Sequence, residues 1–232
     1  MSVYFREETY IKLLSEKEYT VKELSEKLFI SQPTVRRDIA KLKEKDTVTC
    51  VRGIVKLKVK YADSRIPLFV REMEYSEGKK EIAAKAAKYV NDGYTVMLDA
   101  STTACTLLPY LADKKNIIII TNGAHTAIKA VSLGMKVICT GGEMTPDSYS
   151  YVGTDAESIL GKYNADVTFF SCRGISDDGY VTDNSILENS LRRIMIIKSK
   201  KKYLLCDKAK FGKTYLNTLC HKDDLTDVIT DL

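Results

Sequence analysis

The polar side chains between residues 31 and 52 are the first group in the chain whose types and spacing suit a particular chemistry, contact with duplex DNA. Arginine and glutamine can form paired hydrogen bonds with base edges, whereas lysine and the amino end of a helix suit phosphates. A helix here would bury Val35, Ile39 and Leu42 on one stripe and expose its basic residues. The alternative is a merely solvated basic helix and turn. The candidate DNA-binding residues are Ser31, Gln32, Pro33, Thr34, Arg36, Arg37, Lys41 and Arg52.

A second group of polar and glycine residues follows the predicted strands of the longer C-terminal part. Ligands of parallel sheets bind beyond the carboxyl ends of the strands. Residues 99–103 follow one strand and open a helix, so their hydroxyls and amides could converge on an anion. A helix cap, ordinary turns and an exposed lysine are the alternatives for the individual motifs. The candidate ligand-binding residues are Asp99, Ser101, Thr102, Thr103, Thr121, Asn122, Gly141, Gly142, Arg173 and Lys210.

The cysteines and histidines form no pattern typical of a metal or redox centre. The six cysteines contain no C-x-x-C pair and there are two histidines, so we expect no metal and no cofactor. Cys139, Cys172 and Cys206 each end an apolar run, which predicts buried thiols at strand ends. Neither histidine lies in a pattern typical of a catalytic triad; we expect His125 on a helix and His221 in a polar loop.

Local signals predict two helices before the basic one. Apolar spacing indicates a first helix over residues 6–15. Thr20 and Glu23 form a capping box that begins a second helix, and Tyr19 can pack on Leu24 beside it. These helices would support the basic helix.

The basic helix follows after a very short turn, with Ser31 as its N-cap and Pro33 in its first turn. Two helices joined so tightly are typical of a helix-turn-helix, in which the second helix enters the major groove. Residues 47–51 and 54–59 are rich in β-formers and flank Arg52-Gly53, which predicts a hairpin, the wing. Residues 1–59 are therefore predicted to form a winged helix-turn-helix domain.

Helix and strand patterns alternate in the rest of the chain, which predicts an α/β fold with a mostly parallel sheet. We place a linker at residues 60–78 and a second domain at residues 79–232. Expected strands cover residues 94–98, 117–121, 136–140, 167–172 and 203–206, and expected helices cover residues 76–89, 103–111 and 187–199.

The positive charge of the chain is concentrated near its N-terminus. Residues 1–60 hold 14 Lys and Arg against 9 Asp and Glu, and residues 61–232 hold 22 against 22, so the whole net charge of +5 lies in the first part. A polyanion would meet that part first.

The chain is expected to be cytoplasmic and free of membrane contact. Its first residues lack a basic segment followed by an apolar core, and the longest aliphatic run, residues 117–120, is far too short to span a bilayer.

The basic helix resembles the recognition segment of DeoR-type bacterial transcriptional regulators. The segment is Leu28-Phe29-Ile30-Ser31-Gln32-Pro33-Thr34-Val35-Arg36-Arg37-Asp38-Ile39. The likeness continues at Arg71, Lys80, Ile82, Ala83, residues 99–103, Thr121-Asn122, Gly141-Gly142, Val152-Gly153, Asp207, Lys210-Phe211-Gly212 and Ile229-Thr230-Asp231. The resemblance implies a repressor of a sugar-catabolic operon whose C-terminal domain is ribose-5-phosphate-isomerase-like, that is Rossmann-like, and binds a phosphorylated sugar.

This sequence departs from the family pattern in three places. Cys50 replaces a basic residue of the wing, and Gly53-Ile54 replaces a Gly-Gly tip. The sequence also ends at Leu232, whereas family members continue into a further helix and strand, so a sheet edge or interface is expected to be incomplete.

Three functions follow as hypotheses. The leading one is a DNA-binding regulator, a homodimer or higher homo-oligomer, whose partners are operator DNA and a phosphorylated sugar. The second is a sugar-phosphate isomerase or deaminase carrying a DNA-binding appendage, but the segment equivalent to the isomerase acids, residues 171–174, contains no carboxylate; Asp177, Asp178 and Glu188 are nearby. The third is a constitutive DNA-binding protein with a degenerate second domain.

Overall fold

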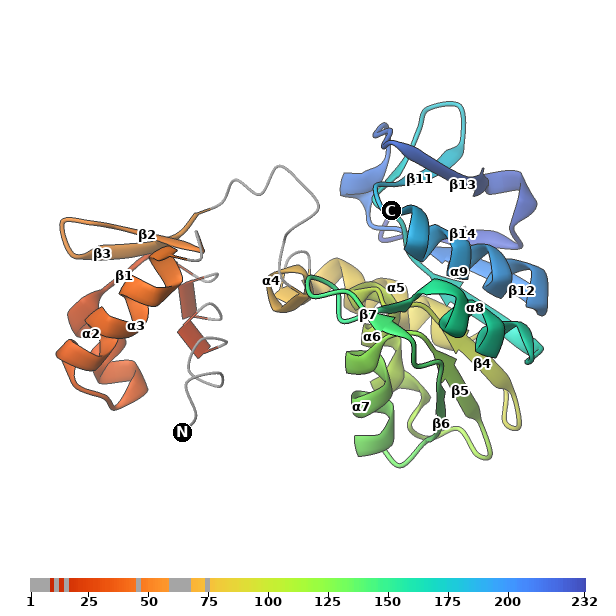
Figure 1. Cartoon of the computed structure of the whole chain (residues 1–232), viewed down its shortest axis with the longest axis horizontal. Coiled ribbons are helices and arrows are strands. Elements are labelled where there is room, and N and C mark those ends of the chain that lie inside the picture. Colours follow the sequence, from red (N-terminus) through yellow and green to blue (C-terminus); the bar gives the residue numbers. More distant parts are fainter. Residues whose placement is uncertain (1–8, 11–12, 15–16, 45–46, 59–67, 74–75) are drawn as a thin grey trace. The chain divides into compact units, whose positions relative to one another are not determined.

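The chain forms two compact units, Met1–Glu74 and Tyr75–Leu232, each with its own hydrophobic core (Figure 1). The computed structural model describes residues 9–10, 13–14, 17–44, 47–58, 68–73 and 76–232. Most of the predicted linker, residues 60–78, lies outside the described residues. Among the residues that are described, none of the helices is both long and apolar enough to span a bilayer.

The first unit is a winged helix-turn-helix, as the sequence predicts. Residues 9–10 and 13–14 are helical, and the remainder of the predicted first helix lies outside the described residues. Three short strands form an antiparallel sheet in the order β1-β3-β2. The elements are β1 (Tyr19–Thr20), α2 (Val21–Leu28), α3 (Gln32–Glu44), β2 (Val48–Val51) and β3 (Ile54–Leu57); α4 (Leu68–Met73) follows.

The predicted caps and hairpin of this unit are confirmed. The Thr20 hydroxyl accepts a hydrogen bond from the Glu23 amide at 3.2 Å, and the Glu23 carboxylate accepts one from the Thr20 amide at 2.7 Å. Tyr19 and Leu24 are buried in the same core. Arg52 and Gly53 have φ of 50° and 79°, and positive φ at both positions is what a tight hairpin turn of this hand requires.

Phe29 occupies the turn between α2 and α3 in a conformation that disfavours its own side chain. Its φ of 53° and ψ of 41° are left-handed, and its side chain is 94% exposed. A bulky residue in this region costs about 1–2 kcal/mol, and asparagine tolerates it better. Phe29→Asn is therefore expected to raise the stability of the first unit by about 1 kcal/mol, measured by calorimetry of the full chain.

Phe29→Ala is the matched control for that prediction, because it removes the same exposed ring without a preference for left-handed backbone. It should leave the unfolding temperature of the unit nearly unchanged. An equal loss of stability in both variants, relative to the wild type, would show that the aromatic ring and not the backbone conformation sets the stability of this turn.

The second unit is built on a six-stranded parallel sheet in the order β14-β12-β9-β4-β5-β6 (Figure 1). Its strands are β4 (Thr95–Leu98), β5 (Ile118–Thr121), β6 (Lys136–Cys139), β9 (Ala165–Phe170), β12 (Ser199–Leu205) and β14 (Asp227–Ile229). Its α-helices are α5 (Ser76–Ala87), α6 (Thr102–Leu107), α7 (Ala124–Ser132), α8 (Gly153–Gly161) and α9 (Ile186–Lys198). The predicted parallel α/β fold is thus confirmed.

Alternation of apolar residues along the strands gives the sheet two buried faces. Leu98 and Phe169 pack with α5, α6 and α7 on one face, and Met97 and Ile120 pack with α8 and α9 on the other. Helices on both faces are what a parallel sheet requires, because both of its surfaces are apolar.

Two small antiparallel sheets extend this unit, and the sequence patterns did not predict either one. Their strands are β7 (Glu143–Met144) with β8 (Tyr151–Val152), and β10 (Gly174–Ile175), β11 (Tyr180–Asp183) and β13 (Asn217–His221). The short 3-10 helices are η1 (Leu108–Leu111), η2 (Lys208–Lys210) and η3 (Lys222–Asp224).

Two expectations for single residues were wrong. His221 ends β13 and caps η3 rather than lying in a loop. Cys139 is exposed rather than buried, because β6 is the edge strand of the sheet. Cys172 and Cys206 are buried and His125 lies on α7, as expected.

Candidate functional sites

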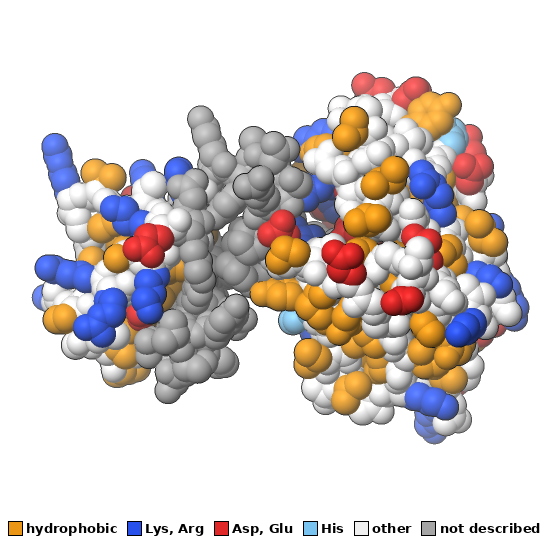
Figure 2. All heavy atoms as spheres, in the orientation of Figure 1, with side chains coloured by type: hydrophobic (Ala, Val, Ile, Leu, Met, Phe, Trp, Pro, Cys, Tyr) orange, Lys and Arg blue, Asp and Glu red, His pale blue; other side chains and the backbone are white. Residues whose placement is uncertain are grey.

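The exposed face of α3 carries the residues that the sequence selects for DNA contact. Gln32, Pro33, Arg36, Arg37 and Lys41 are exposed, whereas Thr34 is half-buried. Figure 2 shows Lys and Arg side chains gathered on the described part of the first unit. The predicted division of α3 is confirmed, because its apolar stripe of Val35, Ile39 and Leu42 is buried.

Ser31 and Arg52 flank this face. The Ser31 hydroxyl accepts a hydrogen bond from the Thr34 amide at 3.4 Å and contacts the Thr34 hydroxyl at 2.9 Å, which is the predicted capping position. Arg52 is exposed at the tip of the β2–β3 hairpin. Asp38 was not predicted to be buried; it accepts a hydrogen bond from the Tyr10 hydroxyl at 3.3 Å and ties α3 to the N-terminal helical segment.

In the second unit, the strand order brings polar residues from distant parts of the chain into one row. Asp207, Ser171, Asp99 and Asn122 follow the carboxyl ends of β12, β9, β4 and β5, which are neighbours in that order. The Ser171 amide donates to Asp99 at 3.3 Å, and the Ser171 hydroxyl donates to the Leu205 carbonyl at 2.7 Å. Parallel sheets in general bind their ligands beyond the carboxyl ends of the strands, so this row is the candidate ligand site.

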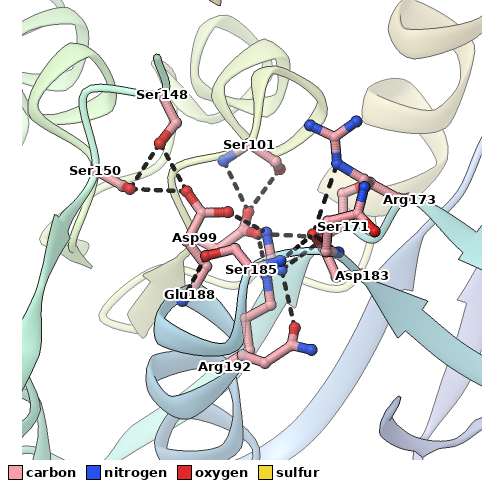
Figure 3. A network of polar contacts seen from close by, with 12 residues as sticks. Asp99, Ser101, Ser148, Ser150, Ser171, Arg173, Asp183, Ser185, Glu188 and Arg192 are labelled. Carbon is pink, nitrogen blue, oxygen red and sulfur yellow. Dashed lines mark hydrogen bonds and ion pairs between the residues drawn. The ribbon is translucent and has the colours of Figure 1, made fainter. Parts of the chain in front are cut away.

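Arg192 of α9 lies at the centre of this row and is buried (Figure 3). Its Nε donates to Asp99 at 2.9 Å, one terminal nitrogen donates to Asp183 at 2.9 Å, and the other donates to Glu188 at 3.3 Å. Asn189 accepts a further hydrogen bond at 3.1 Å. The guanidinium therefore neutralises carboxylates that come from a strand end, a small sheet and its own helix.

These contacts shift the pKa values of both partners. Burial lowers the pKa of Arg192, but the charges of Asp183, Asp99 and Glu188 reverse this effect and raise it above its ordinary value. Burial raises the pKa of Asp183, but the charge of Arg192 and the amides of Ser185 and Asn184 leave it below its ordinary value. Both groups are therefore charged at neutral pH.

Glu188 also connects the row to the loop between β7 and β8. One of its carboxylate oxygens accepts hydrogen bonds from the Ser148 and Ser150 hydroxyls, both at 2.7 Å (Figure 3). Thr145 contacts the same two hydroxyls at 2.6 and 2.8 Å. The Glu188 carboxylate thus holds this loop close to Arg192 and the row.

Two cationic side chains next to the row, Lys210 and Arg173, are partly exposed. The Lys210 ammonium donates to the Ser171 hydroxyl at 2.9 Å and lies 3.3 Å from Asp207, with its side chain 22% exposed. The Arg173 guanidinium lies 3.7 Å from Asp183, with its side chain 26% exposed. Lys210 is thus paired within the row rather than an isolated surface lysine.

The remaining predicted ligand-binding residues lie at the same edge of the sheet. Ser101 caps α6, but its amide and hydroxyl both donate to Asp99, at 3.1 and 2.5 Å, so this amide is already occupied. Thr102 and Thr103 are buried in the first turn of α6. The buried Thr121 hydroxyl accepts from the Gly123 amide at 3.0 Å.

Gly141 and Gly142 have different environments. Both have positive φ, 63° and 110°. A Cβ on Gly141 would meet open space, whereas one on Gly142 would lie 2.9 Å from the Val152 carbonyl oxygen. Gly142 is thus required by packing against β8, and Gly141 is the one beside which a ligand has room.

Two buried acceptors in the row have no hydrogen-bond partner among the described residues. They are Oδ1 of Asn122, whose amide nitrogen donates to the Tyr151 carbonyl at 3.1 Å, and Oδ1 of Asp207. An unpaired buried acceptor costs free energy, so a ligand that brings hydroxyl donors would relieve it.

The sequence did not identify five residues of this region as candidate ligand-binding residues: Arg192, Asp183, Asp207, Ser148 and Ser150. The available signal was the spacing of Glu188 and Arg192, which are four residues apart in α9 and therefore lie on the same face of the helix. From the sequence, Glu188 is only an acid near the segment equivalent to the isomerase acids.

The two units together define a transcription regulator with a helix-turn-helix and a sensor domain. The protein-family model described as "DeoR-like helix-turn-helix domain" matches residues 6–59, and the family model described as "DeoR C terminal sensor domain" matches residues 74–232. The chain belongs to the DeoR family, as the sequence predicts.

Curated relatives are similar over almost the whole chain. The HTH-type transcriptional regulator IolR of Bacillus subtilis is 33% identical over 223 residues, 94% of this chain and 86% of IolR. The lactose phosphotransferase system repressor of Staphylococcus epidermidis is 30% identical over 235 residues, 100% of this chain and 93% of the repressor. The chain is accordingly a transcriptional regulator rather than an enzyme.

The structure is also similar to ribose 5-phosphate isomerase from Methanocaldococcus jannaschii. The alignment covers 59% of this chain and 54% of the isomerase, with a TM-score of 0.45 and 15% identity. A likeness of this size carries no conclusion about activity.

Proposed function

We propose that this regulator controls a sugar-metabolism operon and that a phosphorylated sugar, bound in the row at the carboxyl ends of β12, β9, β4 and β5, changes its affinity for operator DNA. One observation carries the proposal: this end of the sheet holds two partly exposed cations, Lys210 next to Asp207 and Arg173 next to Asp183, and it also holds unpaired buried acceptors on Asn122 and Asp207. Cations suit a phosphate, and unpaired acceptors suit sugar hydroxyls.

The proposed partners are operator DNA, the sugar phosphate and a second copy of the chain. The name of the staphylococcal relative, a lactose phosphotransferase system repressor, supports a sugar operon and negative control. The exposed face of α3 supports base reading, with Arg36 and Arg37 as the principal contacts and Arg52 in the wing. We propose a homodimer because one recognition helix covers only a half-site. We also propose a cytoplasmic location, since this is where a bacterial regulator would meet its operator.

Two carboxylates bound to Arg192, those of Asp183 and Glu188, are poorly suited to act as the base of the isomerase alternative. A general base for proton abstraction benefits from a raised pKa and a free lone pair. Asp183 has a lowered pKa, and Glu188 is occupied by Arg192 and two serine hydroxyls. This arrangement suits binding of a ligand better than abstraction of a proton from it.

The proposal is tested by fluorescence anisotropy of the full chain on its own promoter, with and without a series of aldose, ketose and amino-sugar phosphates. We expect promoter to be preferred over random duplex and at least one sugar phosphate to change the affinity, since a ligand acts only through its differential affinity for the two states. Equal binding to random duplex would refute operator recognition. No response to any sugar phosphate would refute the switch, and light scattering that gives a monomer on operator would refute the dimer.

Lys210→Gln is expected to weaken binding of the sugar phosphate by about tenfold to a hundredfold, because it removes a charge-assisted contact of about 1.5–3 kcal/mol. The measurement is a titration of the sugar phosphate that is active in the promoter assay. Lys208→Gln is the matched control, since Lys208 lies in the same short helix η2 and is exposed. Equal affinities of the two variants would remove Lys210 from the binding site.

A further inference from the structure

Two thiols lie side by side where β9 and β12 end. The register of these parallel strands pairs Phe170 with Leu204 as the last pair. Continued two residues past this pair, beyond the ends of both strands, the same register would set Cys172 opposite Cys206. Side chains alternate between the faces of a strand, and all four residues belong to one buried cluster on the same side of the sheet. Neighbouring strands are about 4.8 Å apart, which is within the Cα separation of a disulfide.

The two thiols differ in chemistry. A hydrogen bond from Cys206 lowers the pKa of Cys172; burial opposes this effect, and the charges of Lys210 and Arg192 reinforce it. The same hydrogen bond and burial raise the pKa of Cys206. Cys172 also keeps a little exposure, whereas Cys206 has none. Cys172 is therefore the nucleophile of the pair and Cys206 the resolving thiol.

We propose that Cys172 and Cys206 form an oxidisable pair that a hydroperoxide converts into a disulfide. The Cys172 thiolate attacks one oxygen of hydrogen peroxide, the O–O bond breaks, and hydroxide leaves as Cys172 becomes a sulfenic acid. The Cys206 sulfur then attacks the Cys172 sulfur, the S–O bond breaks, and water leaves. The hydroxide takes up the proton that Cys172 lost on forming its thiolate, and the thiol proton of Cys206 leaves with the sulfenic hydroxyl as water. Overall two thiols and one peroxide give one disulfide and two waters, with two electrons passing from sulfur to peroxide.

A third thiol near the pair provides a control. Cys220 of β13 is half-buried and packs against the same cluster. Burial, together with the charges of Asp224 and Cys172, raises its pKa to about 12, so it stays protonated at neutral pH. Cys220 is therefore not expected to act as the nucleophile, and it does not lie opposite Cys172 in the β9–β12 register.

The position of the pair gives the disulfide a consequence that rests on the proposed function. Cys172 lies between Ser171 and Arg173, and Cys206 precedes Asp207, so the cross-link would act on residues adjoining the proposed sugar-phosphate site. The oxidised protein is expected to bind the sugar phosphate about tenfold more weakly or worse, and reduction by a dithiol should restore binding.

The test is peptide mass spectrometry of the full-length protein after treatment with hydrogen peroxide and alkylation of the remaining free thiols. We expect a peptide pair linked through Cys172 and Cys206 that a dithiol separates. Cys206→Ala should give no such link and should accumulate a Cys172 sulfenic acid that dimedone traps, whereas Cys220→Ala should form the link as the wild type does.

Two results would overturn the proposal: Cys172 and Cys206 both remaining reduced while exposed Cys139 is oxidised, or a link from Cys172 to Cys220. The wild-type measurement uses neither variant, so a folding defect cannot imitate either result. The mass measurement also involves no ligand, so the link can be established even if no sugar phosphate binds.

Discussion

Arg192→Met is expected to lower the stability of the second unit by about 3–5 kcal/mol, because removal of one partner leaves buried carboxylates without their counter-ion. In the native chain Arg192 donates to Asp99, Asp183 and Glu188, and its side chain is 6% exposed. For a unit of this size the loss corresponds to a fall in melting temperature of about 10 °C or more. Calorimetry of the full chain would measure it.

Lys200→Met is the matched control. Lys200 forms an equally short ion pair, 2.8 Å from Asp166, but its side chain is 79% exposed. Loss of a surface pair changes stability by less than about 1 kcal/mol. Similar melting temperatures for the two variants would mean that the Arg192 network contributes no more than a surface ion pair.

The pH dependence supplies a second readout of the same prediction. The pKa of Asp183 is lowered in the folded chain, so its contribution to stability is present above the unfolded value of about 4 and is lost as pH falls through the folded value. In Arg192→Met the main cause of the lowering is gone and burial raises the pKa. The difference in stability between wild type and variant should therefore be largest near neutral pH and shrink in acid.

The parts of the structure that the sequence predicts are those specified by local signals. The capping box at Thr20 and Glu23, the apolar stripe of α3 and the Arg52-Gly53 turn each depend on residues a few positions apart. The parallel sheet follows from alternating patterns, and a general rule for such sheets predicts that polar residues at the strand ends form the candidate ligand site.

The parts that were missed depend on contacts distant in sequence. Arg192 and Asp99 are 93 residues apart, and no local pattern pairs them. The exposure of Cys139 depends on β6 being the outermost strand, which periodicity does not specify. Ser101 was expected to offer its amide to an anion, and that amide is occupied by Asp99 two residues earlier. Burial and strand order therefore decide which of the predicted polar residues remain available to a ligand.

Arg36→Ala and Arg37→Ala are each expected to weaken operator binding by about tenfold to a hundredfold, since a bidentate contact to a base is worth about 1–3 kcal/mol. Both side chains are exposed on α3, so the stability of the first unit should change by less than about 0.5 kcal/mol. Anisotropy measures the affinity and calorimetry the stability. Lys22→Ala, on the exposed face of α2, is the control and should change neither quantity much.

The salt dependence of these variants separates two roles for the arginines. An arginine that contacts phosphate releases a counter-ion on binding, so its removal should lower the slope of log affinity against log salt by about 1 and weaken all sequences alike. Removal of an arginine that reads a base should instead relax the preference for one base pair of the operator, so that the variant discriminates less well between operator and random duplex. If both variants unfold more easily than the wild type, the two arginines stabilise the fold rather than contact DNA. Asp38 has such a structural role: it follows Arg37 in sequence but is buried and accepts a hydrogen bond from Tyr10.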